Sequence, residues 1–350
     1  MSLNNKQLNI LKKYFNNKTI LVTGGTGSFG KICIKGILQN FNIKKVIIFS
    51  RDEQKQFEMQ NSIIYKKYDS KLRFFIGDIR DFDRLSYACS DVDIIIHAAA
   101  LKQVSVAEYN PMEFVATNIN GSHNVIKASI VKNVNKTILL STDKAVSPVN
   151  LYGATKLSAE KLFIAANNTV GNKKCYFSSV RYGNVIASRG SVIEKFLNLK
   201  KTKDPTFTIT DKSMSRFWIS LEEAVAFVWM SILRMQGGEI FIPKIPTMRI
   251  LDLSKAINKN AQIKYTGIRP GEKIKETLIS IDECFYAIDF DTYYTIVPQI
   301  RFNKKINYFK NAINEKGRKI NKIFEYNSED LKNRLKVPDL ENIIKKIKIH

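Results

Sequence analysis

The segment from Thr23 to Gly30 carries four glycines in eight residues, directly after a short apolar run and at the start of a helical pattern. Gly25, Gly27 and Gly30 fit the spacing GxGxxG. Glycine is needed where a turn takes positive φ and where backbone approaches a pyrophosphate, and the following helix supplies amide donors. A strand before the loop and a helix after it therefore predict a dinucleotide site rather than a plain glycine turn. The predicted contacts in this loop are Gly24, Thr26, Gly27, Ser28, Phe29 and Gly30.

Short apolar runs separated by helical patterns make up the first half of the chain. They are rich in β-branched residues and apolar on both faces, which is typical of parallel strands covered by helices on both sides. The runs lie at residues 19–22, 46–49, 72–76, 94–97, 138–140 and 177–181. This pattern predicts an α/β fold with a Rossmann-type doubly wound parallel sheet.

The pattern changes after about Asn184 and becomes mixed. We expect a helix near 192–199, a strand near 207–210, an apolar helix through 221–235 and a strand at 239–242. The sequence therefore predicts a Rossmann domain at residues 1–184 and a smaller C-terminal α/β substrate lobe with an extension at 185–350. Elements near 215–245 are expected to return to the main sheet. The last 50 residues are polar and lysine-rich and reveal no function.

The composition narrows the class of protein. The chain has 350 residues, of which 44% are hydrophobic and 25% charged, and no apolar run reaches membrane-spanning length. The net charge is +24, but the lysines are spread along the chain. This favours a solvated basic surface, with a minor share for phosphate groups, over a nucleic-acid site. Four scattered cysteines favour free thiols in a cytoplasmic protein, and three histidines without ligand spacing predict no metal site.

The end of the second predicted strand indicates which dinucleotide binds. NAD-binding proteins usually place an acid there to hold the ribose hydroxyls, whereas this chain reads Ser50-Arg51-Asp52. A guanidinium beside the ribose suits a 2′-phosphate, so we predict NADP(H). The alternative places Arg51 on the surface and turns Asp52 to the ribose. The predicted cofactor contacts in this part of the chain are Ser50, Arg51, Asp52, Lys55, Asp78, Ile79, Ala98 and Lys102.

Tyr152 and Lys156 are four residues apart and share a helix face. An ammonium beside a phenol lowers the phenol pKa, so such a tyrosine can take a proton from a sugar hydroxyl while hydride leaves the same carbon for the cofactor. The spacing alone carries little weight, because Tyr14 and Lys18 match it too. The position of the pair, after the glycine loop and after a strand that ends at Thr142, distinguishes it.

Several segments together carry a family resemblance. They read STDKA at 141–145, NLYGATK at 150–156, VRYGNV at 180–185 and RPGEK at 269–273. With the glycine loop they resemble the extended short-chain dehydrogenase/reductase superfamily, and within it the short, soluble UDP-N-acetylglucosamine 4,6-dehydratases that invert C5. The likeness runs from about residue 19 to 273 and continues more weakly beyond. It implies NADP(H) as cofactor with Val185 beside it, UDP-N-acetylglucosamine as substrate, and a homo-oligomer, either a dimer or a larger assembly such as a hexamer.

The implied reaction removes water from the sugar. Oxidation of C4 to a ketone acidifies the C5 proton, and loss of that proton and of the C6 hydroxyl gives an enone. Hydride then returns to C6 and a proton to C5, giving UDP-2-acetamido-2,6-dideoxy-β-L-arabino-hex-4-ulose, the first intermediate for pseudaminic acid-type sugars. Relatives that retain C5 typically read Thr-Asp-Glu where this chain has Thr142-Asp143-Lys144.

The resemblance and the chemistry together suggest roles. Lys144 transfers the C5 proton, Asp143 protonates the C6 leaving group, and Tyr152, supported by Lys156, acts on the C4 hydroxyl that Thr142 orients. A lysine is a base only when neutral. Burial and the oxidised cofactor lower the pKa of Lys144 and Asp143 raises it, so the sequence leaves the balance open. A structural ion-pair lysine is the alternative.

The substrate contacts follow from the same motifs. The resemblance gives Arg269 to the UDP phosphates, Glu272 to the uridine ribose and Asn184 to the substrate, with Thr142 and Lys102 as further contacts. The alternatives are a surface role for Lys102 and a simple turn at residues 270–271. Residues 216–218 read Arg-Phe-Trp; one interpretation has them line the same substrate lobe, but aromatic core packing is favoured.

Three other functions stay open at this point. A retaining 4,6-dehydratase shares every motif except Lys144. A nucleotide-sugar epimerase has the same fold but needs no Asp-Lys pair for eliminating water. A non-catalytic NADP-sensing protein also fits the glycine loop, but it can dispense with Tyr152 and Lys156.

Overall fold

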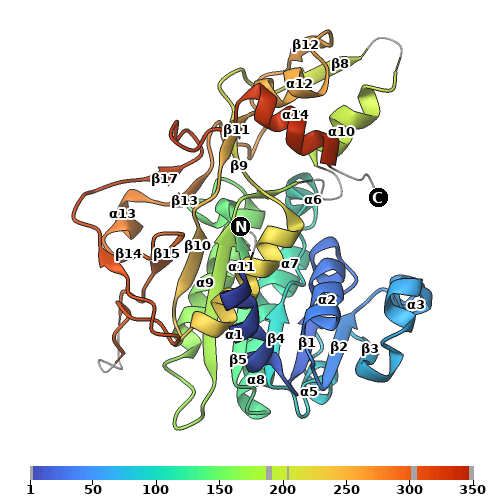
Figure 1. Ribbon diagram of the computed structural model, residues 1–350, viewed down its shortest axis with the longest axis vertical. Helices are drawn as coiled ribbons and strands as arrows, with labels where there is room; N and C mark the ends of the chain where they lie inside the picture. The colour runs from blue at the N-terminus through green and yellow to red at the C-terminus, as the bar shows by residue number, and fades with distance from the viewer. Residues whose placement is uncertain (1–2, 187–190, 203–204, 301–305, 347–350) are drawn as a thin grey trace.

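The computed structural model describes residues 3–186, 191–202, 205–300 and 306–346. Within these residues the centre of the protein is a ten-stranded sheet in the order β16-β14-β15-β10-β6-β5-β4-β1-β2-β3. The strands from β3 to β10 run parallel, and β15, β14 and β16 add an antiparallel edge (Figure 1). The order 3-2-1-4-5-6 is that of a doubly wound dinucleotide-binding fold. The predicted fold class is confirmed.

All six apolar runs form parallel strands of this sheet. Their bounds are β1 (Thr19–Thr23), β2 (Lys45–Ser50), β3 (Leu72–Ile76), β4 (Ile94–His97), β5 (Lys136–Thr142) and β6 (Tyr176–Tyr182), and β10 (Ile240–Pro243) joins them. Strands β1 and β4 are buried at every residue. Burial on both faces explains why these strands read as continuous apolar runs rather than as alternating ones.

Helices cover both faces of the sheet and give it two cores. One core joins α1 (Asn5–Phe15), α2 (Ser28–Asn40) and α11 (Leu221–Arg234) to the sheet. The other joins α5 (Phe82–Ala88), α8 (Gly121–Val131) and α9 (Leu151–Ala166) to its opposite face. Successive residues of β1, Leu21 and Val22, belong to different cores, as the alternation of side chains along a strand requires.

A smaller lobe lies beyond the carboxyl ends of the parallel strands (Figure 1). It contains α10 (Val192–Leu199), β8 (Thr206–Ile209), α12 (Ile250–Ile257), β12 (Gln262–Tyr265) and α14 (Val337–Lys346), with a core of its own. A three-stranded sheet links it to the main body, built from β7 (Asn184–Val185), β9 (Ser215–Ile219) and β11 (Thr247–Arg249). The domain boundary at residue 184 stays a prediction. Two elements that follow it in the chain, α11 and β10, pack with the large sheet.

The segment after residue 276 contains strands that the sequence did not predict. Strand β15 (Tyr293–Ile296) pairs with β10, β14 (Ala287–Asp289) and β16 (Arg318–Lys319) extend that edge, and β13 (Thr277–Ile279) pairs with β17 (Tyr326–Asn327). The remaining elements are α3 (Glu53–Asn61), α4 (Ile63–Lys66), η1 (Asp69–Lys71), α6 (Val104–Tyr109), α7 (Pro111–Phe114), the π-helical turn η2 (Val115–Asn120), the 3-10 turn η3 (Asp143–Ala145) and α13 (Ile281–Cys284).

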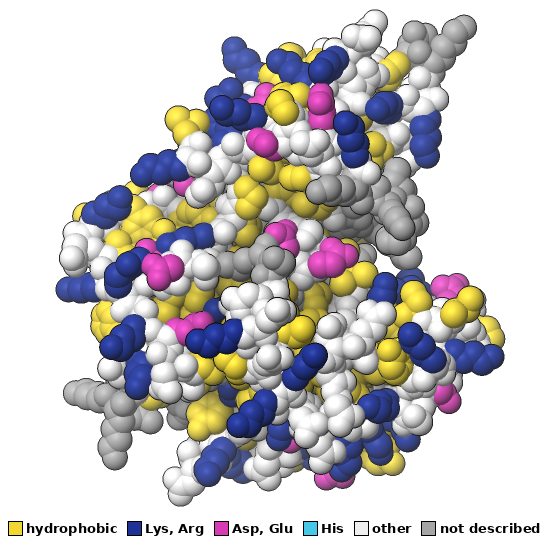
Figure 2. Space-filling view, viewed as in Figure 1, with side chains coloured by type: hydrophobic (Ala, Val, Ile, Leu, Met, Phe, Trp, Pro, Cys, Tyr) yellow, Lys and Arg dark blue, Asp and Glu magenta, His cyan; other side chains and the backbone are white. Residues whose placement is uncertain are grey.

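Lys and Arg side chains are scattered over the face that Figure 2 shows and do not gather in a single patch there. This agrees with a solvated basic surface. All four cysteines are buried and free. Among the described residues, no helix combines the length and the apolar character that crossing a membrane requires.

Candidate active site

The predicted catalytic residues lie where β5 ends and α9 begins. Strand β5 ends at Thr142, and the 3-10 turn η3 carries Asp143 and Lys144. Helix α9 follows closely, because Gly153 lies against the turn. A Cβ on Gly153 would lie 2.2 Å from the carbonyl oxygen of Lys144. This close approach brings Tyr152, in the first turn of α9, next to Thr142, with which its hydroxyl forms a hydrogen bond.

Asp143 is the centre of this group and is fully buried. Its Oδ1 accepts hydrogen bonds from Thr142 Oγ1 at 2.9 Å and from Lys144 Nζ at 3.1 Å. Its Oδ2 is buried and has no hydrogen-bond partner in the described part of the chain. Lys144 Nζ also donates to Asn184 Oδ1 at 3.4 Å, so Asn184 joins the four residues that the sequence placed here.

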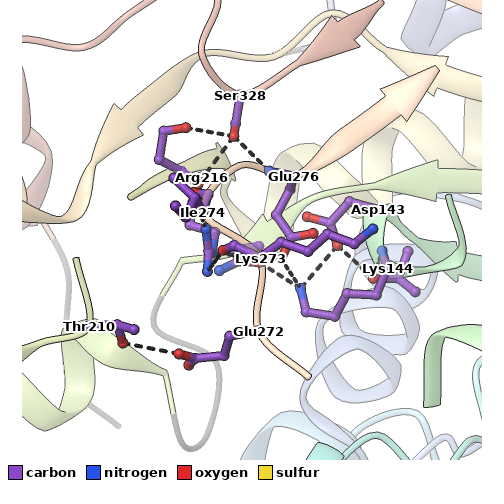
Figure 3. Close-up of polar contacts among 12 residues, drawn as sticks. Asp143, Lys144, Thr210, Arg216, Glu272, Lys273, Ile274, Glu276 and Ser328 are labelled. Atoms are coloured by element: carbon purple, nitrogen blue, oxygen red, sulfur yellow. Dashed lines mark hydrogen bonds and ion pairs between the residues drawn. The ribbon is translucent and has the colours of Figure 1, made fainter. Parts of the chain in front are cut away.

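A second carboxylate, which the sequence did not reveal, reaches Lys144. Glu276 is 3% exposed, and its Oε1 lies 3.3 Å from Lys144 Nζ and 3.7 Å from Arg216 Nε. Figure 3 shows Lys144 and Glu276 pointing toward one another. Burial disfavours the ammonium, but Asp143 and Glu276 outweigh burial and raise the pKa of Lys144. The balance that the sequence left open therefore makes Lys144 a cation.

Tyr152 and Lys156 are both buried in α9 and have different surroundings. Burial raises the pKa of Tyr152, and the charge of Lys144 and the hydrogen bond with Thr142 oppose that rise. Lys156 Nζ donates to the carbonyl oxygen of Leu140 at 2.7 Å. Burial lowers the pKa of Lys156 to about 8, against the charge of Glu160. Lys144 is therefore the cation that most lowers the pKa of Tyr152 in this arrangement. Lys156 links α9 to β5, and its expected effect on the phenol stays a prediction.

The glycine loop has the geometry of a dinucleotide site. Gly24 has a φ of +65°, and a Cβ on it would lie 2.9 Å from the backbone nitrogen of Ala99. A Cβ on Gly30 would lie 2.5 Å from the carbonyl oxygen of Gly25. Helix α2 begins after Gly27 without a side-chain cap, so the amides of its first turn meet no capping side chain. Close backbone and uncapped amides fit a pyrophosphate.

The side chains at the end of β2 form a polar corner beside this loop. Ser50 Oγ accepts a hydrogen bond from Thr26 Oγ1 at 3.1 Å, which ties the loop to β2. Asp52 caps α3 by accepting from the backbone nitrogen of Lys55 at 2.9 Å and also pairs with the Lys55 ammonium. The half-exposed Arg51 lies 3.5 Å from Asp78. Asp52 is thus engaged in capping α3, and Arg51 is paired with Asp78 on the exposed side of the same corner.

The other predicted contacts lie around the same edge of the sheet. Ala98 follows β4 and donates its amide to Thr23 at the end of β1. Ile79 is buried after β3. Lys102 is exposed in the loop after β4, and Val185 is half-buried in β7 beside Asn184. These residues surround the carboxyl ends of the central strands, where ligands bind in open α/β sheets.

The RPGEK segment reaches the site from the smaller lobe. Gly271 has a φ of +77°, and its carbonyl oxygen accepts from Asn150 Nδ2 at 2.8 Å. Arg269 is exposed, and Glu272 accepts from Thr210 at 3.0 Å (Figure 3). The predicted turn therefore closes against the start of α9, with Arg269 and Glu272 on the lobe side, away from the Asp143–Lys144 pair.

Comparison with known proteins identifies the family. Residues 20–298 match the polysaccharide biosynthesis protein family. The chain belongs to this family. It is 53% identical to the inverting UDP-N-acetylglucosamine 4,6-dehydratase of Campylobacter jejuni, over 90% of this chain and 94% of that protein. It is also 41% identical to the UDP-glucose 4-epimerase of Rickettsia bellii, over 94% and 96%. The solved structure of Pen from Bacillus thuringiensis matches with a TM-score of 0.84 and 38% identity, over 95% and 98%.

The residues that the sequence missed in this family member lie between its two parts. Arg216 is 7% exposed and donates to the carbonyl oxygens of Lys273 and Ile274. Lys273 Nζ donates to the carbonyl oxygen of Val146 at 2.6 Å. Phe217 and Trp218 are buried, which confirms their core role. Lys273 stands in a quoted motif, but no spacing rule joins positions 216 and 276 to position 144.

Proposed function

We propose that the protein is a UDP-N-acetylglucosamine 4,6-dehydratase that inverts C5 and catalyses the first step of pseudaminic acid-type sugar synthesis. The observation that carries this function is the contact of an acid and an amine, Asp143 and Lys144, beside Tyr152 at the end of β5. The similarity to the Campylobacter jejuni enzyme over 90% of the chain supports it. Water elimination needs an acid and a base, and this pair supplies both.

Tyr152 begins the reaction by taking the proton of the C4 hydroxyl. The positive charge of Lys144 and the hydrogen bond with Thr142 favour the phenolate that this requires. A bound nicotinamide dinucleotide supplies the redox chemistry, taking hydride from C4 and returning it to C6. The residues that would hold it are the glycine loop and the polar corner at the end of β2.

The elimination step requires a proton to move within the pair first. Against the effect of burial, Asp143 and Glu276 raise the pKa of Lys144, and the resulting ammonium cannot accept the C5 proton. Transfer of one proton across the 3.1 Å contact to Asp143 turns Lys144 into an amine and Asp143 into an acid together. The amine then removes the C5 proton, and the acid protonates the departing C6 hydroxyl to give water. Lys144 later returns a proton to C5 on the face opposite to the one from which the first was taken, as inversion requires.

Thr142 provides a route for resetting the site. Each turnover leaves the C4 hydroxyl proton on Tyr152 and removes one proton from Asp143. Thr142 Oγ1 donates to Asp143 at 2.9 Å and is hydrogen-bonded to Tyr152, so a proton can pass between them through one hydroxyl. Tyr152 and Asp143 then return to their starting protonation states, and no further acid is needed.

Incubation with UDP-N-acetylglucosamine in D₂O, without added reductant, tests this function. We expect loss of water, deuterium at C5 and an inverted C5 configuration in the product by proton NMR. The variant Lys144→Ala should lose the C5 exchange. Exchange at the wild-type rate in that variant would remove Lys144 from the mechanism, and retained configuration would point to the retaining reaction.

We also propose NADP(H) as the cofactor. Asp52 caps α3 and pairs with Lys55, which leaves Arg51 as the residue in place for a 2′-phosphate. Charge-assisted hydrogen bonds contribute ~1.5–3 kcal/mol, so Arg51→Ala should lower the preference for NADP over NAD by about tenfold to 100-fold. The control is Arg73→Ala, because Arg73 lies near the amino end of β3, whereas Arg51 pairs with Asp78 beyond the carboxyl end of that strand. Equal affinities of the wild-type protein for NAD and NADP would overturn the assignment.

The proposal also covers the residues that contact the substrate, the location of the protein and its assembly as a homo-oligomer. Arg269 is assigned to the UDP phosphates and Glu272 to the uridine ribose, with Asn184 and Lys102 nearer the sugar. Buried free cysteines suit a reducing cytoplasm. The homo-oligomer is tested by sedimentation of the purified protein.

Epimerisation at C4 is the second candidate, favoured by the 41% identity to the Rickettsia bellii epimerase. The two functions differ in mass balance. An epimerase returns a C4 epimer of the same mass and needs no acid for the C6 hydroxyl. Mass spectrometry of the product from UDP-N-acetylglucosamine or UDP-glucose therefore separates them, since the dehydratase product is lighter by one water.

A further inference from the structure

Glu276 is a buried carboxylate at the candidate site that no step above uses. It is 3% exposed, and its Oε2 has no hydrogen-bond partner within the described residues. Its Oε1 is shared by two cations, Lys144 Nζ at 3.3 Å and Arg216 Nε at 3.7 Å. A buried charge with one oxygen unpartnered is costly for the fold, which marks it as a candidate functional group.

Glu276 completes the surroundings of Lys144 Nζ. Three oxygens surround that nitrogen, from Asp143 at 3.1 Å, Glu276 at 3.3 Å and Asn184 at 3.4 Å. A protonated lysine has three hydrogens, so one oxygen is available to each of them. The three oxygens come from η3, β7 and the residue before β13, which fixes a long, flexible side chain from three directions.

The C-terminal segment holds Glu276 in place. The backbone nitrogen of Glu276 donates to Ser328 Oγ at 2.9 Å, and the backbone nitrogen of Ser328 donates to the Glu276 carbonyl oxygen at 2.8 Å. Ser328 is fully buried and its hydroxyl is also hydrogen-bonded to Ser215 Oγ at 2.8 Å. Figure 3 shows Ser328 above Glu276, on the side away from Lys144. Through the β13–β17 pairing, the C-terminal segment that carries Ser328 thus supports Glu276.

We propose that Glu276 is a positioning residue for C5 proton transfer, which holds Lys144 in place and stabilises the ammonium that forms as Lys144 takes the C5 proton. Asp143 cannot stabilise that ammonium at this moment, because as the acid for the C6 hydroxyl it is neutral. Glu276 is then the carboxylate that still faces Lys144. This role rests on the proposed dehydratase function and concerns the C5 step, whereas C4 oxidation depends on Tyr152.

The first experiment separates these two steps in Glu276→Gln. The variant is mixed rapidly with NADP and UDP-N-acetylglucosamine, and the absorbance of reduced cofactor is followed beside deuterium exchange at C5. We expect reduced cofactor to form at nearly the wild-type rate and to accumulate, while C5 exchange and water loss fall roughly 100-fold, as when one electrostatic stabiliser is removed. Equal slowing of both steps, or of neither, overturns the proposal.

The second experiment needs no substrate and therefore stands if the proposed function fails. Trace acetic anhydride labels only the neutral amine, and mass spectrometry of the Lys144 peptide gives the pH at which labelling begins. Loss of a carboxylate beside an ammonium lowers its pKa. Labelling of Lys144 should begin at lower pH in Glu276→Gln than in the wild type, and an unchanged onset contradicts the contact. The charged and titratable groups around Lys144 that stay unchanged are Asp143, Tyr152, Arg216 and Lys273.

Two further variants control for folding. Glu325→Gln removes a carboxylate that pairs with Lys275 at 3.1 Å in the same corner, and both readouts should stay at wild-type values. Glu276→Asp keeps the charge but shortens the side chain, so it should preserve the labelling onset and slow C5 exchange less than Glu276→Gln. A melting curve reveals whether Glu276→Gln folds. If it does not, Glu276→Asp still tests whether C5 exchange slows while C4 oxidation does not. C5 exchange at the wild-type rate in Glu276→Asp would refute a positioning role.

Discussion

Arg181 of β6 forms a buried ion cluster that fastens the catalytic helix to the C-terminal part of the chain. Its guanidinium is fully buried and donates to Glu160 of α9 at 3.1 and 2.6 Å. It also donates to Glu283 of α13 at 2.9 and 3.0 Å and to the carbonyl oxygen of Leu278 at 2.9 Å. Both carboxylates thus share one cation. Because they are separated from water, loss of that cation would leave two buried charges without a partner.

Replacing Arg181 with Met should therefore destabilise the protein severely. Removal of one partner from a buried ion pair costs ~3–5 kcal/mol, because an uncompensated charge is left behind. Here two carboxylates lose their partner, Glu160 is fully buried and Glu283 nearly so, so we expect the upper end, about 5 kcal/mol. Neutralising both acids in the triple variant Glu160→Gln, Arg181→Met, Glu283→Gln removes the stranded charges and should restore much of the loss.

Urea unfolding, followed by circular dichroism, measures these free energies. Lys259→Met is the matched control, because its pair with Glu341, at 3.4 Å, has a lysine side chain that is 74% exposed. Exposed pairs contribute ~0–1 kcal/mol, so this variant should unfold close to the wild type. An Arg181→Met protein within about 1 kcal/mol of the wild type would refute the reasoning, as would a triple variant less stable than the single one.

Three further perturbations have defined outcomes. In Gly153→Ala the new Cβ would lie 2.2 Å from the Lys144 carbonyl oxygen and displace the 3-10 turn, so kcat should fall about 100-fold with the protein still folded by circular dichroism. In Gly30→Ala the Cβ would lie 2.5 Å from the Gly25 carbonyl oxygen, and fluorescence titration should show dinucleotide affinity reduced about tenfold or more. Burial lowers the pKa of Lys136 to about 8, so the unfolded chain binds the extra proton between about pH 8 and 10.5 and stability rises with pH across that window. Lys136→Met should reduce that rise by up to ~3 kcal/mol in urea unfolding at the two pH values, and the share from Lys156, whose pKa is also lowered to about 8, should stay.

The parallel half of the fold was predictable because each strand carries its own signal. Strands β1, β2, β4, β5 and β6 are buried on both faces, so apolar runs mark them directly, and the glycine loop fixes the first crossover. Strands β14 to β17 have two to four residues, and the side chains of β16 are exposed. Strands β14 to β16 depend on pairing at the edge that β10 provides, and β17 depends on pairing with β13. Sequence periodicity could not reveal them, because these pairings are not a local pattern.

The residues of the candidate site also divide into those that the sequence could predict and those that it could not. Thr142, Asp143, Lys144 and Tyr152 lie within eleven residues, and a strand followed by a helix brings them together without help from the rest of the chain. Lys156 Nζ donates to the carbonyl oxygen of Leu140, a contact that the four-residue spacing did not reveal, and its expected effect on the phenol stays a prediction. Glu276 is 132 positions from Lys144, so only the folded arrangement of the two parts brings them into contact.

The charge of Lys144 shows why that distant contact matters for the chemistry. With Asp143 as its only partner, Lys144 would form a simple ion pair that collapses to amine and acid when a substrate excludes water. Glu276 changes this, because it keeps a negative charge beside Nζ whether or not Asp143 carries the proton. In the proposed mechanism Lys144 is then stabilised as an ammonium both before the proton moves to Asp143 and after C5 gives up its proton. Proton removal at C5 would therefore depend on all three residues rather than on the lysine alone.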